Sequence, residues 1–150
     1  MADHVFTEAL VSLLGGANAI DWDSAGTNLK VALVMTNTTA DTVVDAKNPA
    51  DVTMDEFDGS GYARQTLASP TNNLDLANDR AELDGNDIAF GALGNGTRAI
   101  QGYVILFNVD GTDANDLLVM YKDFASTINP GGSSFSIAWN AEGIIQLANA

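Results

Sequence analysis

The sequence contains no cysteine, a single histidine and only six lysine or arginine residues, and these shortages exclude several kinds of chemistry. Without cysteine there are no disulfides, no thiolate metal ligands and no cysteine nucleophile. A histidine-based catalytic triad or metal site would have to be built around His4 alone. We therefore expect His4 to occupy an exposed position at the start of a terminal helix.

Positive charge is scarce as well, and the 20 aspartate and glutamate residues give the chain a formal net charge of −14. Nucleic acids and anionic membranes are bound through clustered lysine and arginine, so neither is an expected partner. A solvated acidic exterior is the simplest interpretation, and docking on a basic surface of another protein is the alternative. Because apolar runs are short, we expect neither a membrane-spanning segment nor a secretory signal.

The first sixteen residues show the periodicity of a helix. In ADHVFTEALVSLLGG, apolar residues recur at helical spacing and form one stripe. Asp3 is placed to cap the first turn, and one of the two final glycines to close the helix in a left-handed conformation. The stripe packs either on its own domain or on a neighbouring chain. In the second case the candidate partner-binding residues are Phe6, Leu10 and Leu13.

From residue 17 onward the hydrophobic period changes to two, which is typical of β-strands. Alternation is clearest in LKVALVMT, LLVMYKDF and SFSIAWN, and turn-forming stretches such as DGND, NPGGSS and NAEG separate the strands. We therefore predict a single domain over residues 1–150, with a helix over 1–16 followed by a β-rich part over 17–150. The fold class is all-β, mainly an antiparallel β sandwich or barrel-like roll with a short N-terminal α-helix.

The strands are expected near residues 29–36, 62–67, 80–83, 87–90, 100–107, 117–124, 134–140 and 143–148. One helical turn is expected over residues 50–57. Large apolar side chains at alternate strand positions form the predicted core: Leu29, Val31, Leu33, Phe90, Tyr103, Ile105, Phe135, Ile137 and Trp139.

The stretch GSGYARQTL, residues 59–67, contains glycines, a serine and an arginine, as anion-binding loops do. A phosphate loop, however, follows a strand, opens onto a helix and usually carries a lysine beside a serine or threonine. Here the glycines follow the acidic segment MDEFD and lead into β-favouring residues without a lysine. We therefore interpret the stretch as a tight turn into a strand, in which Tyr62 is an anchor and Arg64 pairs with a nearby acid.

Three groups of acidic residues are candidates for chemistry: Asp55/Glu56/Asp58, Glu82/Asp84/Asp87 and Asp110/Asp113/Asp116. A glycoside hydrolase needs two carboxylates opposed across a cleft, whereas acids adjacent in a turn are usually solvated. The loop DGTDAND, with Asp110–Asp116, is the best calcium candidate, but it lacks the EF-hand spacing and a bidentate glutamate. A hairpin loop rich in aspartate explains the same residues. We predict no catalytic residues, no cofactor and no obligatory metal ion.

The order of several phrases along the chain carries a resemblance to a known family. A short N-terminal helix precedes LKVALVMT, GSGYARQTL, NDRAELDGNDIAFGAL, GNGTRAIQGYVILFN, LLVMYKDF and a closing GGSSFSIAWNAEGIIQL. Over most of its length the chain resembles the small virion structural proteins of tailed bacteriophages, of the capsid decoration (cement) kind. The resemblance lies in this arrangement and in local phrases such as GYAR and DIAFGAL, and it includes no catalytic motif.

The resemblance implies a β-rich module on the outer capsid surface of the virion. There it would clamp neighbouring major capsid protein subunits. One arrangement that the resemblance implies is a homotrimer of this protein. Such a protein is not an enzyme, and it binds neither nucleic acid nor membrane. The acidity is stronger than usual for this family and leaves the contacting face open. Two alternatives remain, namely a tail-fibre or lectin-like receptor-binding module and a small hydrolase built on carboxylates.

Overall fold

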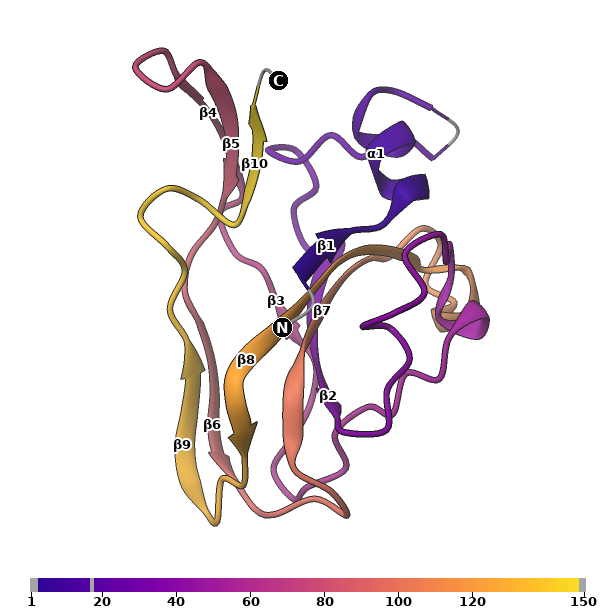
Figure 1. Ribbon diagram of the computed structural model, residues 1–150, viewed down its shortest axis with the longest axis vertical. Helices are drawn as coiled ribbons and strands as arrows, with labels where there is room; N and C mark the ends of the chain where they lie inside the picture. The colour runs from indigo at the N-terminus through magenta and orange to yellow at the C-terminus, as the bar shows by residue number, and fades with distance from the viewer. Residues whose placement is uncertain (1–2, 17, 149–150) are drawn as a thin grey trace.

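The computed structural model describes residues 3–16 and 18–148, and it confirms an all-β fold with one short helix near the N-terminus (Figure 1). The helix α1 spans Thr7–Leu13, and short 3₁₀ turns lie at Pro49–Asp51 and Asp113–Asn115. The first of these turns is shorter and earlier than the turn expected over residues 50–57. The strands are Asp3–Val5 (β1), Leu29–Met35 (β2), Gln65–Thr66 (β3), Thr71–Asp75 (β4), Arg80–Asp84 (β5), Ile88–Leu93 (β6), Ile100–Phe107 (β7), Leu117–Ile128 (β8), Ser133–Ile137 (β9) and Ile145–Ala148 (β10).

The strands form three sheets, and the pairings within them are antiparallel. A five-stranded sheet has the order β1-β8-β7-β2-β3, a three-stranded sheet the order β10-β5-β4, and β6 pairs with β9. In Figure 1 the three-stranded sheet projects from the top of the molecule as an arm, with α1 on the other side of that end. We call β4, β5 and β10 the arm.

The middle of the five-stranded sheet is buried on both faces, and this explains why β2, β7 and β8 are almost continuously apolar. Every residue of β2 except Lys30 is buried. The ring centroid of Tyr103 lies 5.4 Å from that of Trp139 on one face of the sheet. The side chain of Tyr121 points to the other face, where its ring lies 5.8 Å from His4. Neither face of β2, or of the first half of β8, is therefore free to bind a partner.

The pair β6–β9 supplies the second layer of a sandwich through aromatic contacts. Phe90 of β6 stacks on Tyr62 at 5.9 Å, and Phe135 of β9 meets Phe124 of β8 edge to face at 5.7 Å. These are the orientations that aromatic rings prefer. Most of the predicted core is confirmed, since the following residues are buried: Leu29, Val31, Leu33, Phe90, Tyr103, Ile105 and Ile137.

Two predicted core residues, Phe135 and Trp139, are only partly buried and pack against the core from outside. Trp139 lies beyond the last residue of β9, where the second layer of the sandwich ends. Its indole Nε1 donates a hydrogen bond to the carbonyl of Asn86 at 2.7 Å. The alternation of SFSIAWN therefore identified the inward face of the strand correctly but not where the covering layer stops.

The N-terminal segment begins differently from the prediction. Residues Asp3–Val5 form the edge strand β1, which pairs with β8, and α1 begins only afterwards, with Phe6 as its N-cap and no side-chain cap. The carboxylate of Asp3 instead accepts a hydrogen bond from Nζ of Lys122 at 3.0 Å. The helix ends as expected, with Gly15 in the left-handed region at φ 92°. A strand thus anchors the start of the chain, and α1 is shorter than predicted.

Candidate functional site

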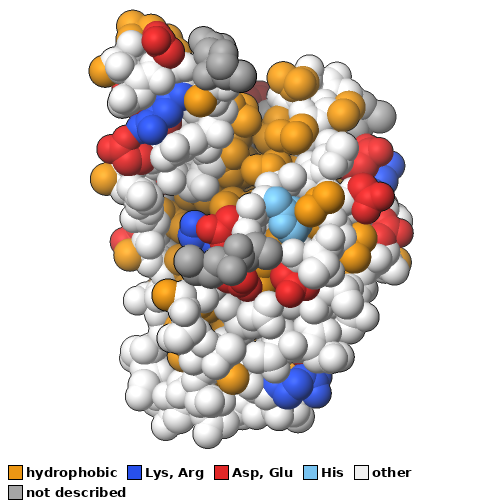
Figure 2. All heavy atoms as spheres, in the orientation of Figure 1, with side chains coloured by type: hydrophobic (Ala, Val, Ile, Leu, Met, Phe, Trp, Pro, Cys, Tyr) orange, Lys and Arg blue, Asp and Glu red, His pale blue; other side chains and the backbone are white. Residues whose placement is uncertain are grey.

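A groove of about 640 Å³ lies between the arm and the C-terminal end of α1. Figure 2 shows it as a hollow with mostly hydrophobic walls at the top of the molecule. One wall comes from α1 and the loop that follows it, with Leu13, Leu14, Ile20 and Trp22. The other wall comes from the arm, with Ala81, Leu83 and Leu147. Segments far apart in the sequence therefore form one apolar surface.

The arm has one apolar and one charged face because side chains alternate along each strand. The strand register places Leu83 opposite Ile145, and Ala81 opposite both Leu147 and Leu74. Residues directly opposite each other in neighbouring strands point to the same side. These five residues therefore share the face that borders the groove, and the charged residues of the arm lie on the other face.

Several leucines in the groove or on the same face of the arm are uncovered. Leu14 is 86% exposed, Leu74 73% and Leu147 37%. Single exposed apolar residues are ordinary, but contiguous apolar surface around a hollow is the usual mark of a binding site. We therefore take the groove as the candidate functional site of the protein.

The three residues predicted to bind a partner are separated by the structure. Phe6 is fully buried in the core, so it offers no surface to a second chain. Leu13 is partly buried and lines the groove. Leu10 is 38% exposed and is not among the lining residues. The helical stripe thus packs mainly within its own chain, and Leu13 is the predicted residue that the structure brings to the candidate site.

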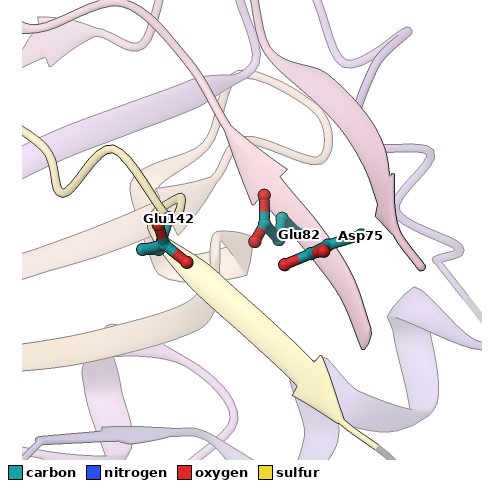
Figure 3. Close-up of side chains that lie close together, drawn as sticks. All are labelled: Asp75, Glu82 and Glu142. Atoms are coloured by element: carbon teal, nitrogen blue, oxygen red, sulfur yellow. The ribbon is translucent and has the colours of Figure 1, made fainter. Parts of the chain in front are cut away.

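Three carboxylates gather at the arm, from Asp75 and Glu82 of its strands and from Glu142 in the turn before β10 (Figure 3). Their oxygen atoms lie within 4.8 Å of one another, which is close enough for one metal ion. The guanidinium of Arg80 lies among them, 3.1 Å from Asp75 and 2.8 Å from Glu82, and also pairs with Glu142. The cluster therefore has a counter-ion within the chain, and its geometry is explained without a metal.

A second ionic cluster confirms the interpretation of GSGYARQTL. Arg64 donates from Nε and Nη2 to the two carboxylate oxygens of Glu56, at 2.9 and 2.8 Å. The hydroxyl of Tyr62 donates to Glu56 at 2.7 Å and accepts from the backbone N–H of Leu33 at 3.1 Å. Burial raises the pKa of Tyr62, so its hydroxyl stays protonated. Tyr62 and Arg64 thus anchor the turn to β2, as predicted.

The calcium candidate loop has partners for its carboxylates within the chain. Asp110 accepts hydrogen bonds from the N–H of Thr112 at 2.9 Å and the amide of Asn115 at 2.7 Å. Asp113 and Asp116 each lie 3.5 Å from Arg64. Asp116 is fully buried, and this burial raises its pKa. The absence of an obligatory ion stays a prediction, and the turn itself accounts for the aspartates.

His4 lies in β1 and not at an exposed helix end, so this expectation was wrong. Its ring meets Phe6 edge to face at 4.7 Å, and its Nε2 is buried without a hydrogen-bond partner. Burial lowers the pKa of His4, so the neutral ring is favoured. The ring therefore serves as a packing group beneath the N-terminal strand.

A second, smaller pocket of about 170 Å³ lies at the end of the sandwich. Its walls include the rings of Tyr103, Phe124 and Trp139, together with the polar side chains of Lys122 and Asn140. Aromatic rings beside a few polar groups are the usual lining of small-molecule sites. This pocket was not predicted, because its residues come from three separate strands and a loop.

No protein-family model, no curated protein and no solved structure matches this chain. The resemblance to capsid decoration proteins is therefore carried by the sequence phrases alone. Within residues 3–16 and 18–148, no helix has the length and apolar character needed to cross a membrane.

Proposed function

We propose that this protein is a non-enzymatic virion structural protein that binds the outer surface of a phage capsid and stabilises contacts between major capsid protein subunits. The observation that carries the proposal is the apolar groove, which leaves Leu14 and Leu147 uncovered beside the sandwich. The resemblance of the sequence to capsid decoration proteins supplies the partner. The acidic exterior suits docking on basic capsid residues, because opposite charges guide association and set the register.

A protein of this size contributes modestly per copy, because binding must offset lost translational and side-chain freedom. On an icosahedral head, many symmetry-related copies act together, and a trimeric linkage would raise the effective concentration of each contact. The expected result is a shell that resists the internal pressure of packaged DNA. Stability of the head, not turnover of a substrate, is therefore the activity to measure.

The test is deletion of the gene from the phage genome, followed by heating of mutant and wild-type heads side by side. We expect the protein in purified wild-type heads, and we expect mutant heads to release DNA at a lower temperature. Adding purified protein back to mutant heads should restore the wild-type release temperature. Absence of the protein from purified heads, with equal DNA retention by both phages, would overturn the proposal.

A second candidate function is the tail-fibre or lectin-like module, and the aromatic pocket is the observation that favours it. Sugar rings commonly pack on exposed aromatic faces beside polar side chains, and Trp139 with Asn140 offers both kinds of group. Detection of the protein only at the tail tip, with glycan binding lost in Trp139→Ala, would favour this function. The carboxylate hydrolase gains no comparable support, since the three clustered acids all form ion pairs with Arg80.

A further inference from the structure

The charges around the apolar groove indicate what kind of partner would cover it. The segments that form it, residues 7–22, 71–84 and 145–148, contain six acidic residues and one basic residue: Glu8, Asp21, Asp75, Asp79, Glu82, Asp84 and Arg80. The one basic side chain already pairs with three carboxylates. The charges of the arm lie on the face opposite the groove, so Asp21 is the charged side chain among the lining residues, and the net acidity of the surrounding segments favours positive charge on an approaching partner.

Asp21 brings this negative charge to the groove itself. Asp21 is exposed and lines the groove next to the buried ring of Trp22. Asp23, two residues further along the chain, is exposed as well, and its carboxyl raises the pKa of Asp21. Two neighbouring carboxylates repel each other once both are ionised, and a nearby lysine or arginine relieves that repulsion. A cationic group is thus favoured at the edge of the apolar surface.

We infer that the groove receives an apolar segment of the capsid shell protein that is flanked by lysine or arginine. This inference rests on the proposed function and names the contact through which it acts. The apolar side chains of that segment lie between Leu14 and Leu147, while its basic flank meets Asp21. Apolar anchors in a pocket, surrounded by a charged rim, are the usual arrangement of a protein interface.

Other occupants are disfavoured by the same charges. A second copy of this chain would bring another net charge of −14 and the same acidic residues to the contact. A fatty acid or an anionic lipid would place its negative headgroup near Asp21 and Asp23. A basic protein segment satisfies both the apolar walls and the acidic rim.

Two pairs of variants test the groove against matched controls. Leu14→Ser removes a leucine that lines the groove and is 86% exposed, and Leu76→Ser removes one that is 76% exposed and outside the groove lining. Asp21→Lys reverses a charge at the groove, and Asp45→Lys makes the same change in net charge at an exposed loop residue. Each protein is mixed with purified heads from the deletion phage, and the bound fraction is measured by co-sedimentation. Unchanged melting temperatures confirm that the variants fold.

We expect Leu14→Ser and Asp21→Lys each to weaken binding roughly tenfold, because a leucine buried by the partner or a close ion pair contributes on that scale. The two control variants should bind within about twofold of wild type. If wild type binds and all four variants bind equally, the groove is not the contact, although the proposed function stands. If wild type does not bind, the proposed function fails and this inference with it. Wild-type dimers that dissociate in Leu14→Ser would instead show that a second copy fills the groove.

The identity of the occupant is tested by cross-linking on the head. Leu14 is replaced by the photo-reactive residue p-benzoylphenylalanine, since its side chain is 86% exposed at the groove. After irradiation of decorated heads, the attached peptide is sequenced by mass spectrometry. We expect a shell-protein peptide with an apolar run flanked by lysine or arginine. Recovery of an acidic peptide, or of a peptide from this chain itself, would overturn the inference.

Discussion

The indole Nε1 of Trp22 donates a hydrogen bond to the backbone carbonyl of Asp84 at 2.8 Å, joining positions 62 residues apart. Trp22 lies in the loop that follows α1, and Asp84 ends β5 of the arm. This single bond therefore links the two walls of the groove. The ring is 1% exposed, so the link is shielded from water.

Truncating Trp22 should destabilise the protein more than truncating Trp139. Trp22→Ala removes a fully buried ring and leaves the carbonyl of Asp84 without its donor, so we expect a loss of about 3–5 kcal/mol. Trp139 is only partly buried, so Trp139→Ala should cost about half as much. Urea denaturation of both variants measures the difference. Equal losses would show that Trp22 does not hold the arm to the rest of the fold.

The pair of Asp55 and Arg98 should make stability depend on pH in the acid range. The side chain of Asp55 is 5% exposed, and its carboxylate accepts hydrogen bonds from Arg98 and from the N–H of Asn37 at 2.8 Å. The hydrogen bond from Arg98 lowers the pKa of Asp55 below its ordinary value of 3.8. The stabilisation is therefore fully present above pH 3.8 and is lost as the pH falls through the lower, folded-state value.

Asp55→Asn should therefore cost about 1–2 kcal/mol at pH 7 and progressively less below pH 3.8. The measurement is the free energy of unfolding of wild type and variant at several pH values. Asp45→Asn is the control, since this exposed residue should change stability by less than about 0.5 kcal/mol at any pH. A difference between Asp55→Asn and wild type that stays constant down to pH 2 would contradict the assignment.

Replacing Arg80 should turn the carboxylate cluster on the arm into a cation site. In Arg80→Ala, Asp75, Glu82 and Glu142 lose their counter-ion while their oxygens stay within reach of one ion. We expect calcium to raise the melting temperature of this variant by several degrees, and chelator to reverse the effect. Wild type should respond to neither. Arg98→Ala is the control for loss of an arginine, and an equal response from it would contradict the prediction.

The central strands were predictable from the sequence because burial on both faces selects long apolar runs, as in β2, β7 and β8. The turn at residues 59–67 was predictable because glycines favour turns. The charge of Arg64 also calls for an acidic partner nearby, and Glu56 is that partner. The edge strand β4 was not predicted. Its sequence TNNLD is rich in residues with low β propensity, and it forms a strand because it pairs with β5.

The candidate site was largely hidden from sequence reasoning because it is created by tertiary contacts. Its walls come from residues near 13–22, 81–83 and 147, and nothing local shows that these segments meet. The helical stripe brought Leu13 to attention, but Phe6 was misplaced because a helix pattern cannot distinguish packing within a chain from docking on another. The one usable signal was the alternation that puts Leu83, Ile145 and Leu147 on a common face.

Added salt should slow the attachment of the protein to phage heads more than it speeds its release. The chain carries a net charge of −14, and its long-range attraction to a basic surface acts during the approach. Raising the ionic strength from about 0.01 to 1 M shortens the Debye length from roughly 30 to 3 Å, so this attraction is screened. Apolar contacts in the groove are not screened, and they set the rate of release.

Surface plasmon resonance with immobilised deletion-phage heads separates the two rates. We expect the association rate to fall by about tenfold or more while the dissociation rate changes by less than about threefold. A dissociation rate that rises with salt as steeply as the association rate falls would show that the contact is held by charge and not by the groove.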